Sequence, residues 1–435
     1  MRYQEKKAQT EGQKIQAIAL LNQFMQDEGF LVNGISVPFT LANFAPGHPN
    51  TVAQLIEEGD TLLIRAAKRG RLDLAHILID QLKTNPSQAR ANDRRTPLLI
   101  ASEEGRVAVV DLLLGRGADV NQARTSDGTT PLLMASMNGH EAVVELLLTK
   151  GADVNQFYRD GTTPLLMASM NRHVAVVELL LGRGADVNQA RTSDGTTPLL
   201  MASMNRHEAV VELLLTKGAD VNQARASDGA TPLLMASAHG DKAVVRLLLI
   251  KGADVYRAYR DGATPLLMAS INGREAVVEL LLNNGADANQ ARSSDGATPL
   301  LMASAHGDKA VVRLLLSKRA DVNEVYKDGT TPLLMASANG HEASVRLLLS
   351  SGAAINKATT SDRATPLLRA SSNGHEAVVR LLLSKGADVN QVYRDGTTPL
   401  LAASMNGRVA VVELLLGSGA DVNQVRTSDG VTPLR

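Results

Sequence analysis

The stretch GTTPLLMASMN, at Gly128–Asn138, decides the fold, because the chain repeats it unchanged at Gly161–Asn171 and Gly195–Asn205. A longer stretch, ATPLLMASAHGDKAVVRLLL, begins at Ala230 and recurs from Ala297. Thr-Pro pairs recur 34 or 33 residues apart along most of the chain. A fixed period of this size predicts a stacked array of structural units, each packing on its neighbours.

One unit shows how the local structure follows from the residues. Thr130 is a good N-cap, and Pro131 suits the first helical position, where no backbone N–H is needed. We expect a short first helix at Leu132–Met137, ended by Asn138 and by Gly139, which tolerates the left-handed conformation. Ala142–Leu148 then has the apolar spacing of a second helix.

The segment Asp160–Gln189, DGTTPLLMASMNRHVAVVELLLGRGADVNQ, closely resembles the ankyrin repeat, and the resemblance extends from about Gly59 to the C-terminus. It implies an all-α repeat solenoid of helix-turn-helix units joined by β-hairpin loops, with binding partners rather than substrates. The family usually has His where this chain has Leu99, Leu133 and Leu166, so the hydrogen bonds of that His do not transfer.

The repeat divides the chain into four parts. Residues 1–58 are not repeat-like; an amphipathic helix is expected within Lys14–Phe30 and a hairpin at Asn33-Gly34. We interpret this part as a cap on the first repeat, with a docking module as the alternative. Residues 59–95 form an atypical, more charged first repeat, and residues 96–431 form ten regular repeats. Residues 432–435 begin a further unit, so we expect either a longer native chain or a fraying last repeat.

Some copies carry arginine where the pattern has glycine. Arg172, Arg206, Arg319 and Arg363 stand at positions that should adopt a left-handed backbone, which costs a non-glycine residue on the order of 1 kcal/mol. We therefore predict that these repeats are locally weaker.

Composition narrows the functional class. Lys plus Arg and Asp plus Glu both number 45, so net charge points neither to nucleic acid nor to an acidic tail. The chain has 0 cysteines, which excludes disulfides and thiolate metal sites. The hydrophilic opening and the lack of a long apolar run predict an intracellular, cytoplasmic protein without a membrane span. A nuclear location and delivery into a host cell both stay open.

The repetition of the same residues argues against catalysis and metal binding. Catalysis needs different residues that converge on one point, whereas an array places identical residues in a line. Equivalent histidines such as His140 and His173 would stand about 8–10 Å apart on stacked helices, too far to share a metal. The methionines equivalent to Met134 fit core packing. We expect no enzyme activity, no cofactor and no metal.

The aromatic residues give the strongest functional clue. All those beyond the first 58 residues fall in loops between repeats: Phe157, Tyr158, Tyr256, Tyr259, Tyr326 and Tyr393. Aromatic residues are enriched at binding hot spots, and four of these tyrosines are expected along one exposed edge. The cations that follow them are Arg159, Arg260, Lys327 and Arg394. On the groove side, we add Met137, Met170 and Met204 at the end of the first helices.

These patterns predict a monomeric, non-enzymatic scaffold or adaptor that binds protein partners through its hairpin tips and concave groove. One alternative is a targeting or regulatory subunit that docks through residues 1–58. The other is a polyanion binder that uses the basic hairpin edge. Against the latter, each loop cation could pair weakly with its neighbouring aspartate.

Overall fold

The computed structural model describes residues 12, 15–24, 26, 61–90, 92–427 and 429–432. Throughout these residues the regular secondary structure is helical. The hairpin predicted at Asn33-Gly34 lies outside them, as does most of the unit predicted to begin at residues 432–435.

The regular repeats each contribute a pair of short antiparallel helices. The first helices, which all begin at a proline, are α4 (Pro97–Glu103), α6 (Pro131–Asn138), α8 (Pro164–Met170), α10 (Pro198–Met204), α12 (Pro232–His239), α14 (Pro265–Ile271), α16 (Pro299–His306), α18 (Pro332–Ala338), α20 (Pro366–Asn373) and α22 (Pro399–Met405). The second helices are α5 (Val107–Gly115), α7 (Glu141–Thr149), α9 (Val174–Gly182), α11 (Glu208–Thr216), α13 (Lys242–Ile250), α15 (Glu275–Asn283), α17 (Lys309–Ser317), α19 (Glu342–Ser350), α21 (Glu376–Ser384) and α23 (Val409–Gly417).

The sequence signals for helix ends act as expected. The Thr130 hydroxyl accepts a hydrogen bond from the Leu133 N–H at 3.2 Å, which satisfies one of the unpaired donors of the first turn. Pro131 occupies the first helical position, and Gly139 ends α6 with a φ of 74°. The observed helices are one or two residues longer than predicted, since helix ends extend to the capping residues.

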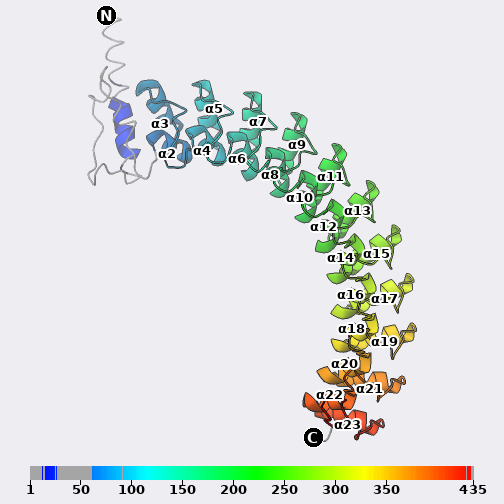
Figure 1. Cartoon of the computed structure of the whole chain (residues 1–435). Coiled ribbons are helices and arrows are strands. Elements are labelled where there is room, and N and C mark those ends of the chain that lie inside the picture. Colours follow the sequence, from blue (N-terminus) through cyan, green and yellow to red (C-terminus); the bar gives the residue numbers. More distant parts are fainter. Residues whose placement is uncertain are drawn as a thin grey trace, which may run out of the picture. The chain divides into compact units, whose positions relative to one another are not determined.

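The chain divides into two compact units, and the division falls within the pair α10/α11. One unit is Met1–Ala202 with Glu212–Ala219, and the other is Ser203–Val211 with Asp220–Arg435. Within each unit the first helices lie against one another in one row and the second helices in a parallel row (Figure 1). The all-α repeat solenoid that the sequence predicts is confirmed.

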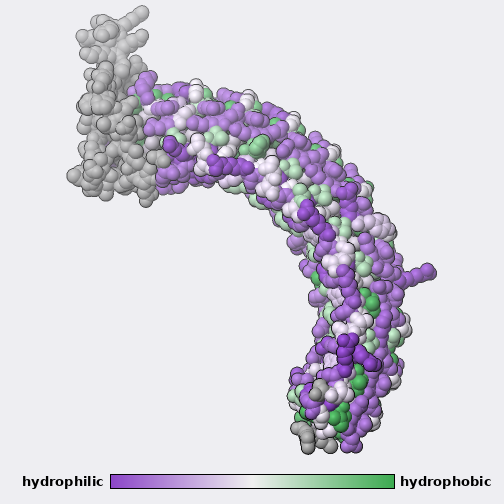
Figure 2. Space-filling model, in the orientation of Figure 1, coloured by the Kyte–Doolittle hydropathy of each residue, from purple (hydrophilic) through white to green (hydrophobic). Residues whose placement is uncertain are grey.

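The core of the first unit lies between neighbouring helix pairs. In α7, Val143, Val144 and Leu147 are fully buried, and Ala135 of α6 is buried with them. On the face shown in Figure 2, hydrophobic residues appear as small areas among hydrophilic ones.

An additional helix pair precedes the regular ones. It consists of α2 (Leu62–Arg69), α3 (Leu72–His76) and the π-helix η2 (Ile77–Gln81), and it lies against α4 and α5. The predicted amphipathic helix is present at residues 15–24, and the ring of its buried Phe24 lies 5.8 Å from the guanidinium carbon of Arg71. The capping role of residues 1–58 stays a prediction.

The β-hairpins implied by the resemblance are not formed as strands in the described residues. Each loop is instead a tight turn; for example, the Tyr158 N–H donates to the Thr162 carbonyl at 2.9 Å. A further bond from the Arg159 N–H to the Asp127 carbonyl, also 2.9 Å, joins it to the preceding loop. Each loop has too few of these backbone hydrogen bonds to form a β-ladder.

The arginines at glycine positions adopt the predicted backbone. The φ angles are 65° at Arg172, Arg206 and Arg319, and 62° at Arg363. The left-handed geometry is thus imposed by the repeat even where the side chain disfavours it.

The first prediction concerns this strain. Replacing Arg319 by Gly should raise the local stability of α17 by on the order of 1 kcal/mol, because glycine adopts a positive φ without a Cβ penalty. Hydrogen exchange of the α17 amides measures the change. Gly352→Arg, at the equivalent position of the next repeat, is the matched control and should weaken α19. Unchanged exchange in both variants would contradict the strain argument.

A second prediction comes from buried serines. The Ser237 hydroxyl is fully buried and has no hydrogen-bond partner among the described residues, whereas the Ser270 hydroxyl donates to the Leu266 carbonyl at 2.8 Å. Because an unpaired buried hydroxyl costs about 1–3 kcal/mol, Ser237→Ala should be neutral or stabilising in urea unfolding. Ser270→Ala should destabilise by about 1 kcal/mol through loss of its hydrogen bond. A larger loss in the Ser237 variant than in the Ser270 variant would sink this interpretation.

Candidate functional site

In each unit a cavity lies between the loops and the first helices, and we call this side of the repeats the loop–helix groove. In the first unit it contains a cavity of 310 Å³ whose floor is formed by Leu133, Met134, Leu166 and Met167 of α6 and α8. Met134 is only 8% exposed, and it packs with Leu99 and Leu133 in one apolar cluster. The floor is therefore hydrophobic.

The walls of this cavity bring together three residues predicted from the sequence. Met137 and Met170 line it from the ends of α6 and α8, and Tyr158 lines it from the loop before α8. Met137 and Tyr158 also pack against the apolar cluster below. Met204, the third predicted methionine, is partly buried at the end of α10 and belongs to the second unit.

The floor residues of the groove are not among the site residues predicted from the sequence. Met134 and Met167 were interpreted only as core, yet they also line the cavity. A usable signal was present, because Met134 lies three residues before Met137 and so shares its helix face.

The predicted exposure of the tyrosines needs correction. Tyr158 is partly buried, and its hydroxyl donates to Asp127 Oδ2 of the preceding loop at 3.1 Å. Tyr259 and Tyr326 point to methionines on the first helix of the preceding repeat, with hydroxyl-to-sulfur distances of 3.1 Å to Met235 of α12 and 3.0 Å to Met302 of α16. Their rings lie over the groove floor because that surface is apolar.

Burial affects the acidity of these tyrosines. Desolvation raises the pKa of Tyr259, Tyr326 and Tyr393 above the usual value for phenol. They therefore act as neutral hydrogen-bonding aromatic walls of the groove.

The other two loop aromatics are exposed as predicted. Phe157 and Tyr256 are both 54% exposed. The Tyr256 hydroxyl donates to the Gly285 carbonyl at 2.7 Å, which ties it to the next repeat. Phe157 thus presents an aromatic ring beside the groove residue Tyr158.

At the loop edge of the groove, one structural position carries tyrosine or arginine in most repeats. The backbone N–H of Arg124, Tyr158 and Arg191 makes the same loop-closing bond, at 2.8–2.9 Å. In the second unit the residues with this bond are Arg225, Tyr259, Arg292, Tyr326, Thr359, Tyr393 and Arg426. One-residue differences in loop length hid this equivalence in the sequence.

The arginines at this position are held by aspartates. Arg191 donates from Nε and Nη2 to Asp194 at 3.0 and 2.7 Å, and Arg292 contacts Asp295 in the same two-pronged way at 3.0 and 2.6 Å. Arg124 is paired with Asp127. These cations are largely neutralised within the groove edge.

The predicted cations that follow the tyrosines behave differently. Arg159, Lys327 and Arg394 are exposed and donate to carbonyls of the preceding loop, for example from Arg394 Nη2 to Thr360 O at 3.2 Å. Arg260 does the same with Ala226 O. The pairing with the adjacent aspartate that we considered does not occur there, because these side chains extend back across the preceding loop.

Histidines of the second-helix N-termini have a structural contact. His140 Nε2 lies 2.8 Å from the Glu103 carbonyl oxygen, which also accepts from Asn138 Nδ2 at 3.1 Å. His173 repeats this contact with the Met137 carbonyl at 3.0 Å. Within the described part of the chain, no three His, Asp or Glu side chains are arranged to hold a metal.

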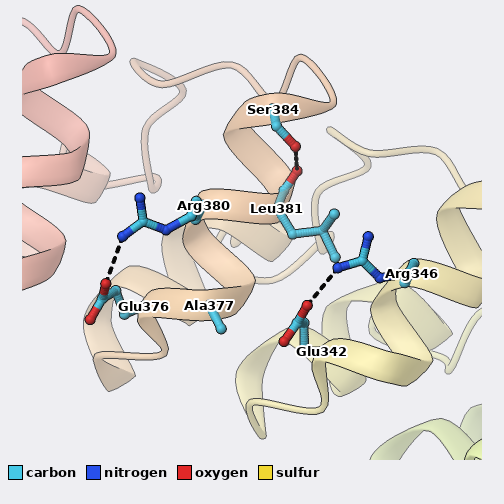
Figure 3. Close-up of a pocket in the computed structure, with 7 residues that line it drawn as sticks. All are labelled: Glu342, Arg346, Glu376, Ala377, Arg380, Leu381 and Ser384. Carbon is cyan, nitrogen blue, oxygen red and sulfur yellow. Dashed lines mark hydrogen bonds and ion pairs between the residues drawn. The ribbon is translucent and has the colours of Figure 1, made fainter.

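A larger hollow lies on the row of second helices in the second unit. It measures 660 Å³ and separates two intrahelical pairs, Glu342–Arg346 on α19 and Glu376–Arg380 on α21 (Figure 3). Both pairs span 2.6–2.7 Å and are about half exposed, so they contribute little. This hollow has the character of an ordinary charged surface.

Among the helices of the described residues, none has the length and apolar character needed to cross a bilayer.

The family model described as "Ankyrin repeats (3 copies)" matches residues 38–124, 121–191, 188–259, 256–326, 318–393 and 353–426. A comparison with curated proteins found no match.

A third prediction concerns pH. Hydrogen bonding from Arg191 holds the pKa of Asp194 well below its usual range, against an opposing effect of desolvation. A carboxyl group whose pKa is lower in the folded state than in the unfolded state, where it is about 3.9, stabilises the folded protein above that unfolded-state pKa. This stabilisation is lost as the pH falls through the folded-state pKa. The urea concentration at the midpoint of unfolding should therefore decrease as the pH is lowered below about 4. Asp194→Asn should show a shallower fall, and equal slopes in the two proteins would contradict this account.

Proposed function

The chain belongs to the ankyrin repeat family, and we propose that it is a non-enzymatic scaffold or adaptor that binds an extended segment of a protein partner in the loop–helix groove. Ankyrin repeats generally serve as protein–protein interaction modules. The observation that carries the proposal is the 310 Å³ cavity with its methionine and leucine floor and its tyrosine wall. Flexible, polarisable methionines suit the binding of apolar side chains.

The polar residues at the rim of the cavity indicate which type of partner residue lies next to the bound apolar side chain. Asp160 lines the cavity, and its carboxylate accepts a single hydrogen bond within the described residues, from the Thr162 N–H at 2.9 Å. Arg124 and Arg191 also line the cavity but are already paired with aspartates. A partner segment with a basic residue next to a large apolar residue therefore complements this site.

The spacing of the array favours an extended partner. Successive repeats stack at about 10 Å, which matches about three residues of extended chain at about 3.3 Å each. A peptide lying across the loops could place one apolar side chain per repeat over the groove floor.

The alternative of polyanion binding has less support. The arginines of the groove edge, including Arg225 and Arg292, are engaged with aspartates. Binding to a polyanion would have to break these pairs, whereas binding of an apolar side chain leaves them intact. The other alternative, docking through residues 1–58, concerns a segment that lies almost entirely outside the described residues.

The fourth prediction tests the groove. Dodecapeptides selected from a displayed random library on the full chain should bind at least tenfold more weakly to the double variant Met137→Gln, Met170→Gln. Glutamine keeps the length and the helix propensity of methionine while removing the apolar wall. Fluorescence polarisation gives the dissociation constants.

The matched control is Met405→Gln, since Met405 occupies the equivalent position on α22 but is 58% exposed. Binding unchanged in the double variant, or no peptide selected at all, would exclude the proposed groove. A loss equal to that in the control would exclude it as well.

A further inference from the structure

One repeat of the second unit departs from its neighbours at two linked positions. Most first helices carry methionine where Met134 stands, and α20 carries Arg369 there. In the preceding loop, Thr359 takes the place that Arg292 and Arg426 occupy elsewhere. In this repeat the arginine therefore stands on the groove floor instead of at the loop edge.

Arg369 still pairs with the aspartate of its own loop. Its Nη2 lies 2.7 Å from Asp362 Oδ2, while Thr359 Oγ1 donates to Asp362 Oδ1 at 2.5 Å. The guanidinium carbon lies 5.5 Å from the centre of the Tyr393 ring. A carboxylate on one side and an aromatic ring on the other therefore fix the orientation of the cation.

This arginine keeps hydrogen-bonding capacity that the loop arginines have used. Arg292 gives both Nε and Nη2 to one carboxylate, whereas Arg369 gives Nη2 alone, and no partner for its Nε or Nη1 occurs among the described residues. The Tyr393 hydroxyl likewise has no hydrogen bond there, unlike those of Tyr259 and Tyr326. Two groups with unused donors thus lie side by side.

These groups open into a cavity of 420 Å³. Arg369, Tyr393, Asp362, Ser361, Arg394 and Asp395 line it. The side chain of Arg369 is 41% exposed, so a ligand in the cavity can reach it.

We infer that Arg369 and Tyr393 bind an aspartate or glutamate side chain of a partner segment that lies in the loop–helix groove of the second unit. This inference rests on the proposed function and assigns the partner an acidic residue at this repeat. A planar carboxylate matches the remaining guanidinium donors. The charges of the two carboxylates and the two cations that line the cavity cancel. A singly charged carboxylate is therefore favoured over a doubly charged phosphate, which Asp362 and Asp395 would repel more strongly.

The chain itself supplies the variant for the test. The double substitution Thr359→Arg, Arg369→Met gives this repeat the combination that Arg292 and Met302 provide in another repeat of the same unit, so Asp362 regains a loop arginine and the fold should be kept. Its thermal unfolding should match that of the original chain. Arg369→Lys, which keeps the charge but not the planar donor set, should give an intermediate loss of acidic preference.

The probes are synthetic dodecapeptides with glutamate, glutamine or phosphoserine at one fixed position and random residues elsewhere, tested on the full chain. We expect glutamate peptides to bind at least tenfold more tightly than their glutamine counterparts, and the double variant to lose this preference. A preference that survives in the double variant, or tighter binding of phosphoserine peptides, overturns the inference.

The outcomes separate this inference from the proposed function. Peptides that bind without any preference for glutamate leave the groove in place and remove the acidic site alone. A complete lack of bound peptides overturns both.

Discussion

The structure depends on one constraint, which is that no helix pair can bury its apolar surface alone. The helices of the regular repeats span only two or so turns, and isolated helices of that length are marginal in water. They are stable because residues such as Val144 and Leu147 lose all exposure between neighbouring pairs. Stability is therefore shared along each unit, and a weak repeat is held by the repeats beside it.

Polar contacts set the register of this stacking. Asn121 accepts from the Asp153 N–H of the next repeat at 2.8 Å and donates to the Gly151 carbonyl at 3.3 Å. Asn155 forms the same two contacts one repeat later. Together with His140 and His173, these side chains satisfy loop and helix-end groups that the fold would otherwise leave unpaired. Such bonds are specific in direction, so they align repeats that apolar burial alone would let slide.

Because the scaffold repeats almost without change, recognition rests on the positions that vary. In most repeats the groove edge carries either a tyrosine that lies over a methionine or an arginine that is paired with an aspartate. At Arg369 this rule is broken, and charge enters the groove floor instead of its edge. A regular array can in this way present different chemistry at successive repeats while its helix pairs and loops keep the same form.

The sequence by itself determined the repeat, the helices and the strained positions, since these follow from local signals such as Thr130, Pro131 and the arginines that replace glycine. It also located every loop aromatic. Only the tertiary structure decided where those side chains point: Tyr158 lies against the preceding repeat, Arg124 and Tyr158 share one structural position, and Met134 faces the groove as well as the core. The physical reason is that each of these contacts joins residues about one repeat apart in the chain. Periodicity shows that such neighbours exist, and the stacking geometry alone selects which atoms meet.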